Sequence, residues 1–328
     1  MKYTIICTGD SVTEGMATEG HHFAEYGKSP YPARLNTVLT DMGYDVEVFN
    51  YGHGGERTPD IAARLGGKLC YFSEDIVINE NNDPVSLGKQ VLTDGRIRNT
   101  KIKICYADGE GEDYCVYFTQ TSHDTNPITV DGAEYILSVV DNENFIKKAK
   151  PDGKKAVIKA GSALFTANRR YADLSVVYGG INDNKSLTLK RWLDLMESCG
   201  TVSGGRYIVL GATHPLWENW SDVKGETAKE KYEYYRRVAN ERFGVHFIDL
   251  YEELSKRWLD IALCAGYFAD KTETEKDVMR GKLLEHIVPA EFTYNKQADG
   301  NVHLSEEGYH AVAVLIAERA ILLGYIRK

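Results

Sequence analysis

The chain begins with an apolar run at residues 3–7 that breaks abruptly into a polar turn at residues 8–15. Several β-prone residues followed at once by Gly-Asp-Ser predict a buried strand that ends in a tight turn. A serine at such a turn would stand at the carboxyl end of a strand, where an open α/β sheet presents its reactive groups. The alternative is that Asp10 or Ser11 simply caps the next helix, which is common at strand-to-helix turns.

The same pattern of strand, polar turn and helix continues along the chain. A helix is predicted over residues 30–40 and a second strand over residues 45–50. This β-α-β start predicts a parallel sheet with right-handed crossovers. Further strands are predicted at residues 172–178, 206–210 and 245–250, and further helices at residues 187–198, 227–243 and 310–323. We therefore expect an α/β fold class.

The middle of the chain has a different pattern. From residue 75 to about residue 169 the helical period disappears, and short alternating segments are separated by turn signals. The strongest of these signals is a hairpin across Asp131 and Gly132. Several short strands at this spacing predict an antiparallel β barrel or sandwich. We therefore predict a discontinuous α/β domain with one inserted β-rich module, at residues 1–75 and 170–328 for the domain and 76–169 for the module.

Composition restricts the partners and the compartment. The 328 residues carry a formal net charge of −9, which argues against a nucleic-acid surface and against tethering to an anionic membrane. No segment approaches the roughly 20 apolar residues that cross a bilayer, and no signal peptide precedes the first strand. The six cysteines lack C-x-x-C spacing, which favours a reducing compartment. We therefore expect a cytoplasmic protein, unless a signal peptide has been removed.

Polar clusters follow the other predicted strands as well. After the second strand comes a glycine-rich turn at residues 52–55, and then Thr58, which can cap a helix. Residues 179–184 follow the third strand, and residues 299–305 precede the last helix. Because the carboxyl ends of parallel strands meet at one edge of a sheet, we expect these clusters to share a crevice with Ser11.

The clusters contain the groups that acyl transfer requires. Ser11 is a hydroxyl nucleophile, His303 is a base, and Asp299 is a candidate to orient the histidine. Backbone N–H groups and an amide side chain could stabilise a tetrahedral oxyanion. The sequence has no metal-ligand spacing, phosphate-binding loop or dinucleotide fingerprint. We therefore expect neither a metal nor a cofactor.

Four motifs occur in the order, and at the loops, that are typical of one family. They are residues 9–11 after the first strand, Gly55 after the second, residues 180–183 after the third, and Asp299 with His303 before the last helix. With these motifs the chain resembles the SGNH/GDSL hydrolase family across both of its α/β portions. The resemblance implies a flavodoxin-like three-layer α/β/α fold and ester hydrolysis through a Ser-His-Asp triad.

The resemblance also implies a role for each matching residue. Ser11 would be the nucleophile, His303 the base and Asp299 the acid that orients it. The family usually has this aspartate three residues before the histidine, whereas here the two are four residues apart. Either the loop bulges by one residue and the two side chains meet, or a backbone carbonyl orients the histidine instead.

The implied oxyanion hole has three donors. They are the backbone N–H groups of Ser11 and Gly55 and the side-chain amide of Asn182, with Gly54 as an alternative to Gly55. The residues expected to support these loops are Asp10, Asp183 and Thr58.

One further histidine follows a predicted strand. His214 comes after the strand at residues 206–210. It could line the crevice, or it could simply end that strand.

The leading functional hypothesis is a serine esterase that removes acetyl or other short acyl groups from a small-molecule or carbohydrate ester. The alternatives are a lipase or acyl-thioesterase of the same fold, and a non-catalytic carbohydrate-binding protein. The β-rich module could be a scaffold or a dimerisation element, which would make the protein a homo-oligomer. It could also cover the site or bind an extended substrate.

Overall fold

The computed structural model describes residues 2–15, 30–91, 97–105, 114–116, 118, 125–167, 172–183, 187–202, 204–294, 299–300 and 302–328. Its contacts divide the chain into two compact units. We call them the α/β unit, Met1–Gly54 with Tyr171–Lys328, and the β unit, Gly55–Arg170.

The first boundary differs from the predicted one. The break falls after Gly54 rather than after residue 75, so helix α3 (Thr58–Leu65) and strand β3 (Cys70–Phe72) lie in the β unit. The reason is that β3 pairs antiparallel with two strands of that unit, β8 (Ile102–Ile104) and β14 (Ala163–Phe165). The second boundary falls one residue after the predicted one.

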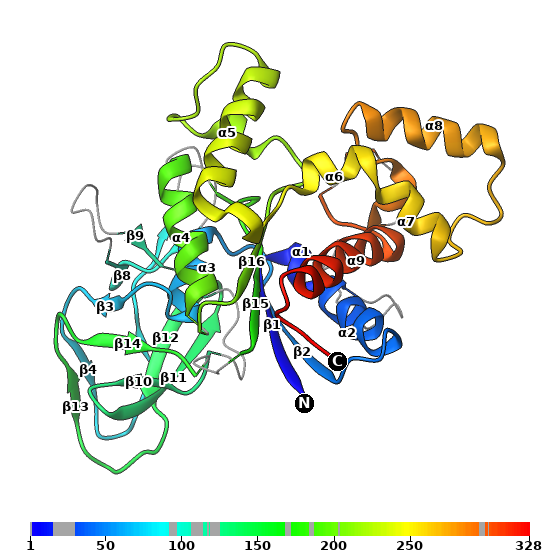
Figure 1. Cartoon of the computed structure of the whole chain (residues 1–328). Helices are drawn as coiled ribbons and strands as arrows, with labels where there is room; N and C mark the ends of the chain where they lie inside the picture. Colours follow the sequence, from blue (N-terminus) through cyan, green and yellow to red (C-terminus); the bar gives the residue numbers. More distant parts are fainter. Residues whose placement is uncertain are drawn as a thin grey trace. The chain divides into compact units, whose positions relative to one another are not determined.

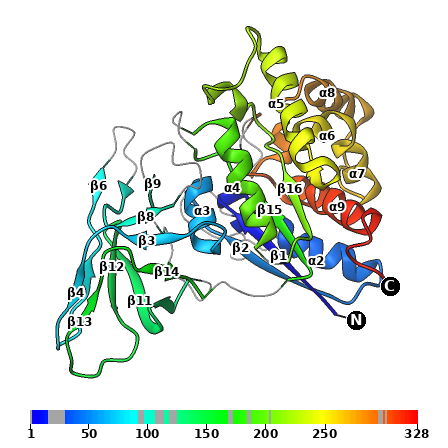
Figure 2. The same cartoon turned by 60° about the vertical axis from the view of Figure 1, so that its left-hand side comes forward.

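The α/β unit is built on a five-stranded parallel sheet (Figures 1 and 2). In sequence order its strands are β1 (Tyr3–Gly9), β2 (Val46–Gly52), β15 (Leu174–Val177), β16 (Tyr207–Leu210) and β17 (Phe247–Ile248). Their order in space is β17-β16-β15-β1-β2, which is the flavodoxin-like order with a switch point between β1 and β15. Sheets of this kind bind ligands outside the carboxyl ends of the strands at the switch point.

Helices cover both faces of this sheet. On one face lie α2 (Tyr31–Asp41) and α9 (Glu306–Leu322), which pack against each other, and on the other lie α4 (Leu189–Thr201) and α5 (Ala228–Phe243) (Figure 1). Strands β15 and β16 are buried along their whole length. This burial is expected for parallel strands that are covered on both sides.

The predicted helices of this unit are confirmed, with ends that differ by a few residues. Ser305 is the N-cap of α9, as expected, and its side chain accepts a hydrogen bond from the Gly308 N–H. The stretch before it contains α6 (Leu250–Lys256), α7 (Trp258–Cys264), α8 (Glu273–Leu284) and the short 3₁₀ helix η4 (Ala290–Phe292). None of the helices formed by the described residues is long and apolar enough to cross a membrane.

The β unit contains an eight-stranded antiparallel sheet in the order β5-β12-β11-β10-β14-β3-β8-β9. The predicted hairpin across Asp131 and Gly132 is confirmed as β10–β11. The barrel or sandwich form stays a prediction. The remaining strands of the sheet are β5 (Val85–Ser86), β9 (Tyr114–Cys115), β10 (Ile128–Val130), β11 (Ala133–Val140) and β12 (Glu143–Lys148). Two small ladders pair β4 (Ile76–Ile78) with β13 (Ala156–Ile158), and β6 (Gln90–Val91) with β7 (Ile97–Arg98).

Helix α3 starts differently from the prediction. Its N-cap is Arg57, and Thr58 is already the first helical residue. The Asp60 carboxylate accepts hydrogen bonds from the Arg57 backbone N–H at 3.2 Å and from its Nε at 2.6 Å. Near the end of α3, the fully buried Arg64 forms an ion pair at 2.8 Å with the fully buried Glu56, which precedes the helix.

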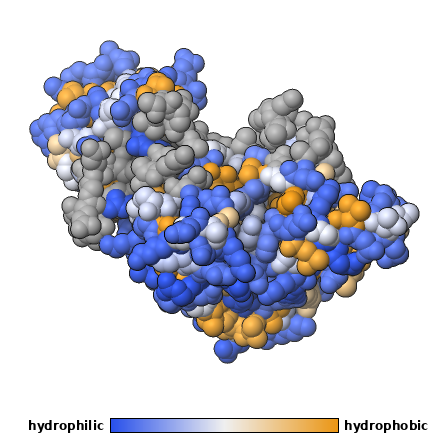
Figure 3. Space-filling view, turned by 90° about the horizontal axis from the view of Figure 1, so that it is seen from above, coloured by the Kyte–Doolittle hydropathy of each residue, from blue (hydrophilic) through white to orange (hydrophobic). Residues whose placement is uncertain are grey.

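The surface is mainly polar on the face shown in Figure 3. Hydrophilic residues dominate that face, and its apolar residues form separate small groups. Apolar residues scattered in this way are normal for a protein surface.

Candidate active site

Ser11 follows β1 directly and is the first residue of the short helix α1 (Ser11–Glu14). Asp10 is the N-cap, and its Oδ1 accepts a hydrogen bond from the Val12 N–H at 3.0 Å. The first N–H groups of a helix, that of Ser11 among them, have no intrahelical acceptor. Asp10 therefore caps the helix, and Ser11 stands at the carboxyl edge of the sheet.

Two glycines allow the strands to end against α1. A Cβ atom at Gly52 would lie 2.1 Å from the backbone nitrogen of Glu14. A Cβ atom at Gly9 would lie 2.8 Å from the carbonyl oxygen of Tyr178. Because backbone atoms cannot move aside as flexible side chains can, both positions require glycine.

His303 reaches Ser11 from the loop before α9. The distance from His303 Nε2 to Ser11 Oγ is 2.9 Å, although the two residues are 292 positions apart in the sequence. The backbone at and just after the histidine is fixed, because the Tyr294 N–H donates to the His303 carbonyl at 2.9 Å and Thr293 forms an antiparallel bridge with Leu304. The structure thus brings together the predicted nucleophile and base at hydrogen-bond distance.

The surroundings of His303 favour its neutral form. Burial lowers the pKa of the imidazole, and the neighbouring His214 lowers this pKa further. A neutral imidazole at pH 7 can accept a proton, as a general base must.

Asp299 does not make the hydrogen bond to His303 that a direct triad requires. Its carboxylate accepts hydrogen bonds from Lys282 Nζ at 3.1 Å and from the Ala290 N–H at 2.7 Å. The Lys282 ammonium holds the pKa of this carboxyl below its ordinary value. The physical reason is the four-residue spacing together with the neighbouring Gly300, whose N–H bonds to the Val288 carbonyl at 2.8 Å. These contacts fasten the beginning of the loop to residues 282–290.

Asn182 and Asp183 lie in the turn after β15. Because β15 pairs in parallel with β1, with Val177 opposite Thr8, this turn begins beside the turn that carries Ser11. The Asp183 N–H closes the turn on the Gly180 carbonyl at 3.0 Å. The two predicted residues therefore stand at the edge of the sheet where the ligand crevice is expected.

Asp10 is a fully buried carboxyl beside this turn. Burial raises its pKa to about 7, and the charges of Asp183 and Glu14 contribute to the increase. Its Oδ2 has no hydrogen-bond partner among the described residues. Asp10 therefore supports the turn as a cap, and ionisation of its carboxyl is disfavoured in the folded protein.

The two glycines considered as oxyanion donors, Gly54 and Gly55, have different surroundings in the glycine-rich turn. The Gly54 N–H donates to Glu14 Oε2 at 2.6 Å, so in this structure a carboxylate already occupies this alternative oxyanion donor. Gly55 has a positive φ of 80° and belongs to the β unit, as does Thr58. The roles of Gly55 and Thr58 beside Ser11 stay predictions.

Sequence reasoning missed two contacts at the edge of the sheet. The sequence did not indicate the hydrogen bond between Glu14 and Gly54, because a glutamate in the first turn of a helix usually faces solvent. His214 did leave a signal, since it follows a buried strand directly. Its ring contacts the Gly300 carbonyl, three residues before His303.

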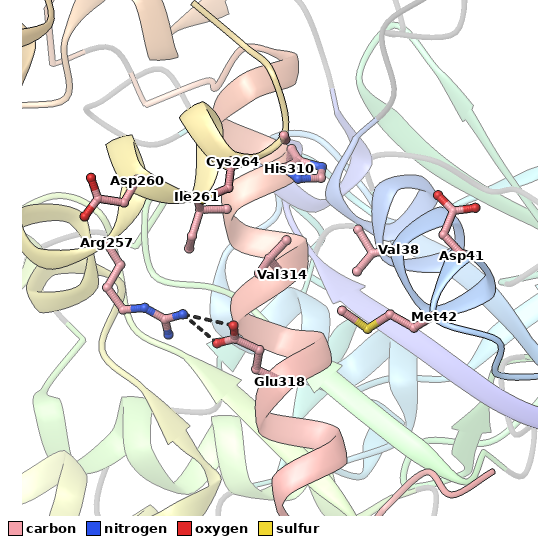
Figure 4. Close-up of a pocket in the computed structure, with 11 residues that line it drawn as sticks. Val38, Asp41, Met42, Arg257, Asp260, Ile261, Cys264, His310, Val314 and Glu318 are labelled. Atoms are coloured by element: carbon pink, nitrogen blue, oxygen red, sulfur yellow. Dashed lines mark hydrogen bonds and ion pairs between the residues drawn. The ribbon is translucent and has the colours of Figure 1, made fainter.

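An apolar cavity of about 590 Å³ lies elsewhere in the α/β unit, between α2, α7 and α9 (Figure 4). Val38, Ile261 and Val314 contribute apolar walls, and an ion pair of Arg257 with Glu318 at 2.7 Å borders it. None of the candidate site residues lines this cavity.

A serine and a histidine are paired at the carboxyl edge of a flavodoxin-like sheet, an arrangement typical of serine hydrolases. The chain belongs to the GDSL-like lipase/acylhydrolase family, whose model matches residues 5–316. This confirms the family resemblance, and membership implies the hydrolysis of esters.

Solved structures and curated proteins add little to this assignment. The crystal structure of the lipase/acylhydrolase from Enterococcus faecalis is similar at 15% identity, with 99% of this chain and 97% of that chain covered and a TM-score of 0.42. A second solved structure is also similar at 15% identity, with coverages of 98% and 97% and a TM-score of 0.39. No curated protein matches the chain.

Proposed function

We propose that this protein is a serine carboxylesterase or acetylesterase that removes acetyl or other short acyl groups from carbohydrate. Family membership supports ester hydrolysis. The observation that carries the proposal is the 2.9 Å contact between Ser11 Oγ and His303 Nε2. This is the geometry in which a base can take the proton of a hydroxyl nucleophile.

In the proposed reaction, His303 accepts the Ser11 proton while Oγ attacks the ester carbonyl. The oxyanion that forms is stabilised by the N–H groups of Ser11 and Gly55 and by the amide of Asn182. His303 then gives the proton to the leaving alcohol, which leaves an acyl group on Ser11. A water molecule, deprotonated by the same imidazole, releases the acid and restores the serine.

The catalytic unit in this proposal is a Ser-His pair rather than a triad through Asp299. That carboxylate is already bound by Lys282 and by the Ala290 N–H, and its charge is balanced there. We therefore assign the orientation of His303 to the backbone contacts of its loop. Asp299 stabilises the start of the same loop.

One feature favours a short acyl group on a polar alcohol over a long acyl chain. The apolar cavity between α2, α7 and α9 is lined by none of the candidate site residues and is not part of the proposed site.

The nucleophile can be tested with a fluorophosphonate probe. We expect the probe to label the wild-type protein at Ser11, and we expect no labelling of Ser11→Ala. The matched control is Ser255→Ala, because the Ser255 hydroxyl bonds to the Glu252 carbonyl within α6, at 3.0 Å. Labelling that survives in Ser11→Ala would refute the assignment of the nucleophile.

The substrate can be tested with p-nitrophenyl esters of increasing chain length and with acetylated oligosaccharides. We expect the highest kcat/KM for the acetate and measurable release of acetate from the oligosaccharide. Rates that increase with chain length would point to a lipase or thioesterase instead. Binding of the oligosaccharide without turnover of any ester would point to a non-catalytic binding protein.

A further inference from the structure

The loop after β16 contains a histidine that is hydrogen-bonded on both sides. His214 Nδ1 lies 2.7 Å from Thr213 Oγ1, and its Nε2 lies 2.8 Å from the Gly300 carbonyl oxygen. A carbonyl oxygen can only accept, so Nε2 carries the proton and donates it. Burial lowers the pKa of His214, which favours a neutral ring whose Nδ1 accepts from the Thr213 hydroxyl.

The Gly300 carbonyl belongs to the loop that presents His303. The N–H of the same glycine bonds to Val288 at 2.8 Å, and the adjacent Asp299 bonds to Lys282 and Ala290. These contacts fix the outer side of the loop. The bond from His214 ties the loop to the edge of the parallel sheet, where Ser11 also lies.

The same short segment also reaches the turn that carries Asn182. A Cβ atom added at Gly180 would lie 2.9 Å from Leu216 Cδ1, so Leu216 packs closely on that turn. The Leu216 N–H donates to the His214 carbonyl at 2.8 Å, which joins the two contacts in one tight bend. Residues 213–216 therefore connect the turn of the predicted oxyanion donor with the loop of the base.

We propose that His214 is a positioning residue for ester hydrolysis. Its ring holds the Gly300 carbonyl, and through it the loop that places His303 Nε2 against Ser11 Oγ. The inference rests on the proposed function. In this proposal His214 helps to orient His303, as a direct Asp299–His303 contact would otherwise do. His214 itself does not contact the reacting atoms.

The proposal predicts a loss of turnover with little loss of substrate affinity. In His214→Ala the loop loses its bond to the sheet, and a misplacement of the base by about 1 Å can cost roughly 10²-fold in rate. With p-nitrophenyl acetate we expect kcat to fall by about 10- to 100-fold, and KM to change little. The rate constant for labelling of Ser11 by the fluorophosphonate should fall in parallel.

Conservative replacement separates positioning from simple packing. The side-chain amide of His214→Gln can donate to the Gly300 carbonyl, whereas His214→Leu has similar bulk and no donor. We expect the Gln variant to recover a large part of kcat and the Leu variant to resemble Ala. The matched control is His246→Ala, because His246 Nδ1 also contacts a backbone carbonyl, that of Tyr207 at 3.0 Å, but lies before β17 at the opposite edge of the sheet. Its kcat should stay at the wild-type value.

Three results would overturn the proposal. They are an unchanged kcat in His214→Ala, an increase in KM alone, and equal kcat values for the Gln and Leu variants. If the Ala variant does not fold, as judged by near-UV circular dichroism, the Gln and Leu pair still decides the question. Failure of the wild-type protein to label at Ser11 would instead refute the proposed function, so the two failures are distinguishable.

Discussion

The buried Asp10 predicts an unusual dependence of stability on pH. Its pKa is raised from 3.8 to about 7 in the folded protein, mainly by burial. Each pKa unit corresponds to about 1.4 kcal/mol, so an ionised Asp10 destabilises the fold by up to roughly 4 kcal/mol. The change Asp10→Asn removes this charge, while asparagine remains a good N-cap that can accept from the Val12 N–H.

The direction of this pH dependence follows from the binding of a proton to Asp10. The folded carboxyl holds its proton more tightly than the unfolded one, so this group lowers the free energy of unfolding as the pH rises from about 4 to about 7. Above about pH 7 its contribution is constant. The advantage of Asp10→Asn over the wild type should therefore be small in acid and largest in mild alkali.

Urea unfolding at pH 5 and pH 8 measures this difference. Between these two pH values we expect the stability advantage of Asp10→Asn to grow by roughly 2.5 kcal/mol. The matched control is Asp45→Asn, because Asp45 is exposed in the same unit. Its free energy of unfolding should track the wild type at both pH values. Parallel pH profiles for Asp10→Asn and the wild type would show that Asp10 ionises freely and would refute the reasoning.

Four further outcomes follow from the site and from α3. Asn182→Ala should lower kcat by roughly 10²–10³ with a small change in KM, because an oxyanion donor acts mainly in the transition state; an effect on KM alone would make Asn182 a binding residue. Asp299→Asn should lower kcat by less than about tenfold, because the carboxylate does not contact His303. A loss near 10⁴ would instead support a Ser-His-Asp triad. As the pH is lowered, kcat/KM should fall only below pH 6.5, because the pKa of His303 is lowered from its ordinary value of 6.5. A fall that begins above pH 6.5 would identify another base. Arg64→Met should cost about 3–5 kcal/mol in urea unfolding, because it removes the guanidinium that pairs with the buried Glu56 carboxylate, and the added change Glu56→Gln should recover much of this loss.

The order of strands and helices in the α/β unit was predictable because each element has its own local signal. Apolar runs such as residues 3–7 and Ser305 as an N-cap depend only on neighbouring residues. The contact between Ser11 and His303 was also predictable, because parallel strands bring their carboxyl ends to a common edge.

The errors arose where a partner distant in the sequence decides the outcome. The predicted boundary at residue 75 left β3 in the α/β domain, and only its ladders with β8 and β14 place it in the antiparallel sheet. Asp299 stands next to the histidine loop in the sequence, but Lys282 and the Ala290 N–H compete for its carboxylate. The cap of α3 is a local exception: Arg57 rather than Thr58 caps the helix, because its guanidinium also pairs with Asp60, three residues further along the chain.

The separation of 292 residues between Ser11 and His303 has a consequence for protein synthesis. At about 5–20 residues per second, the serine is added to the chain roughly 15–60 s before the histidine. During this interval the nascent chain carries a serine with no base beside it, and its hydroxyl is as unreactive toward esters as any other serine. Under the proposed mechanism, a chain interrupted before residue 303 lacks its base, and we expect it to show no esterase activity. Activity should then appear only after the sheet and the final helix have both been assembled.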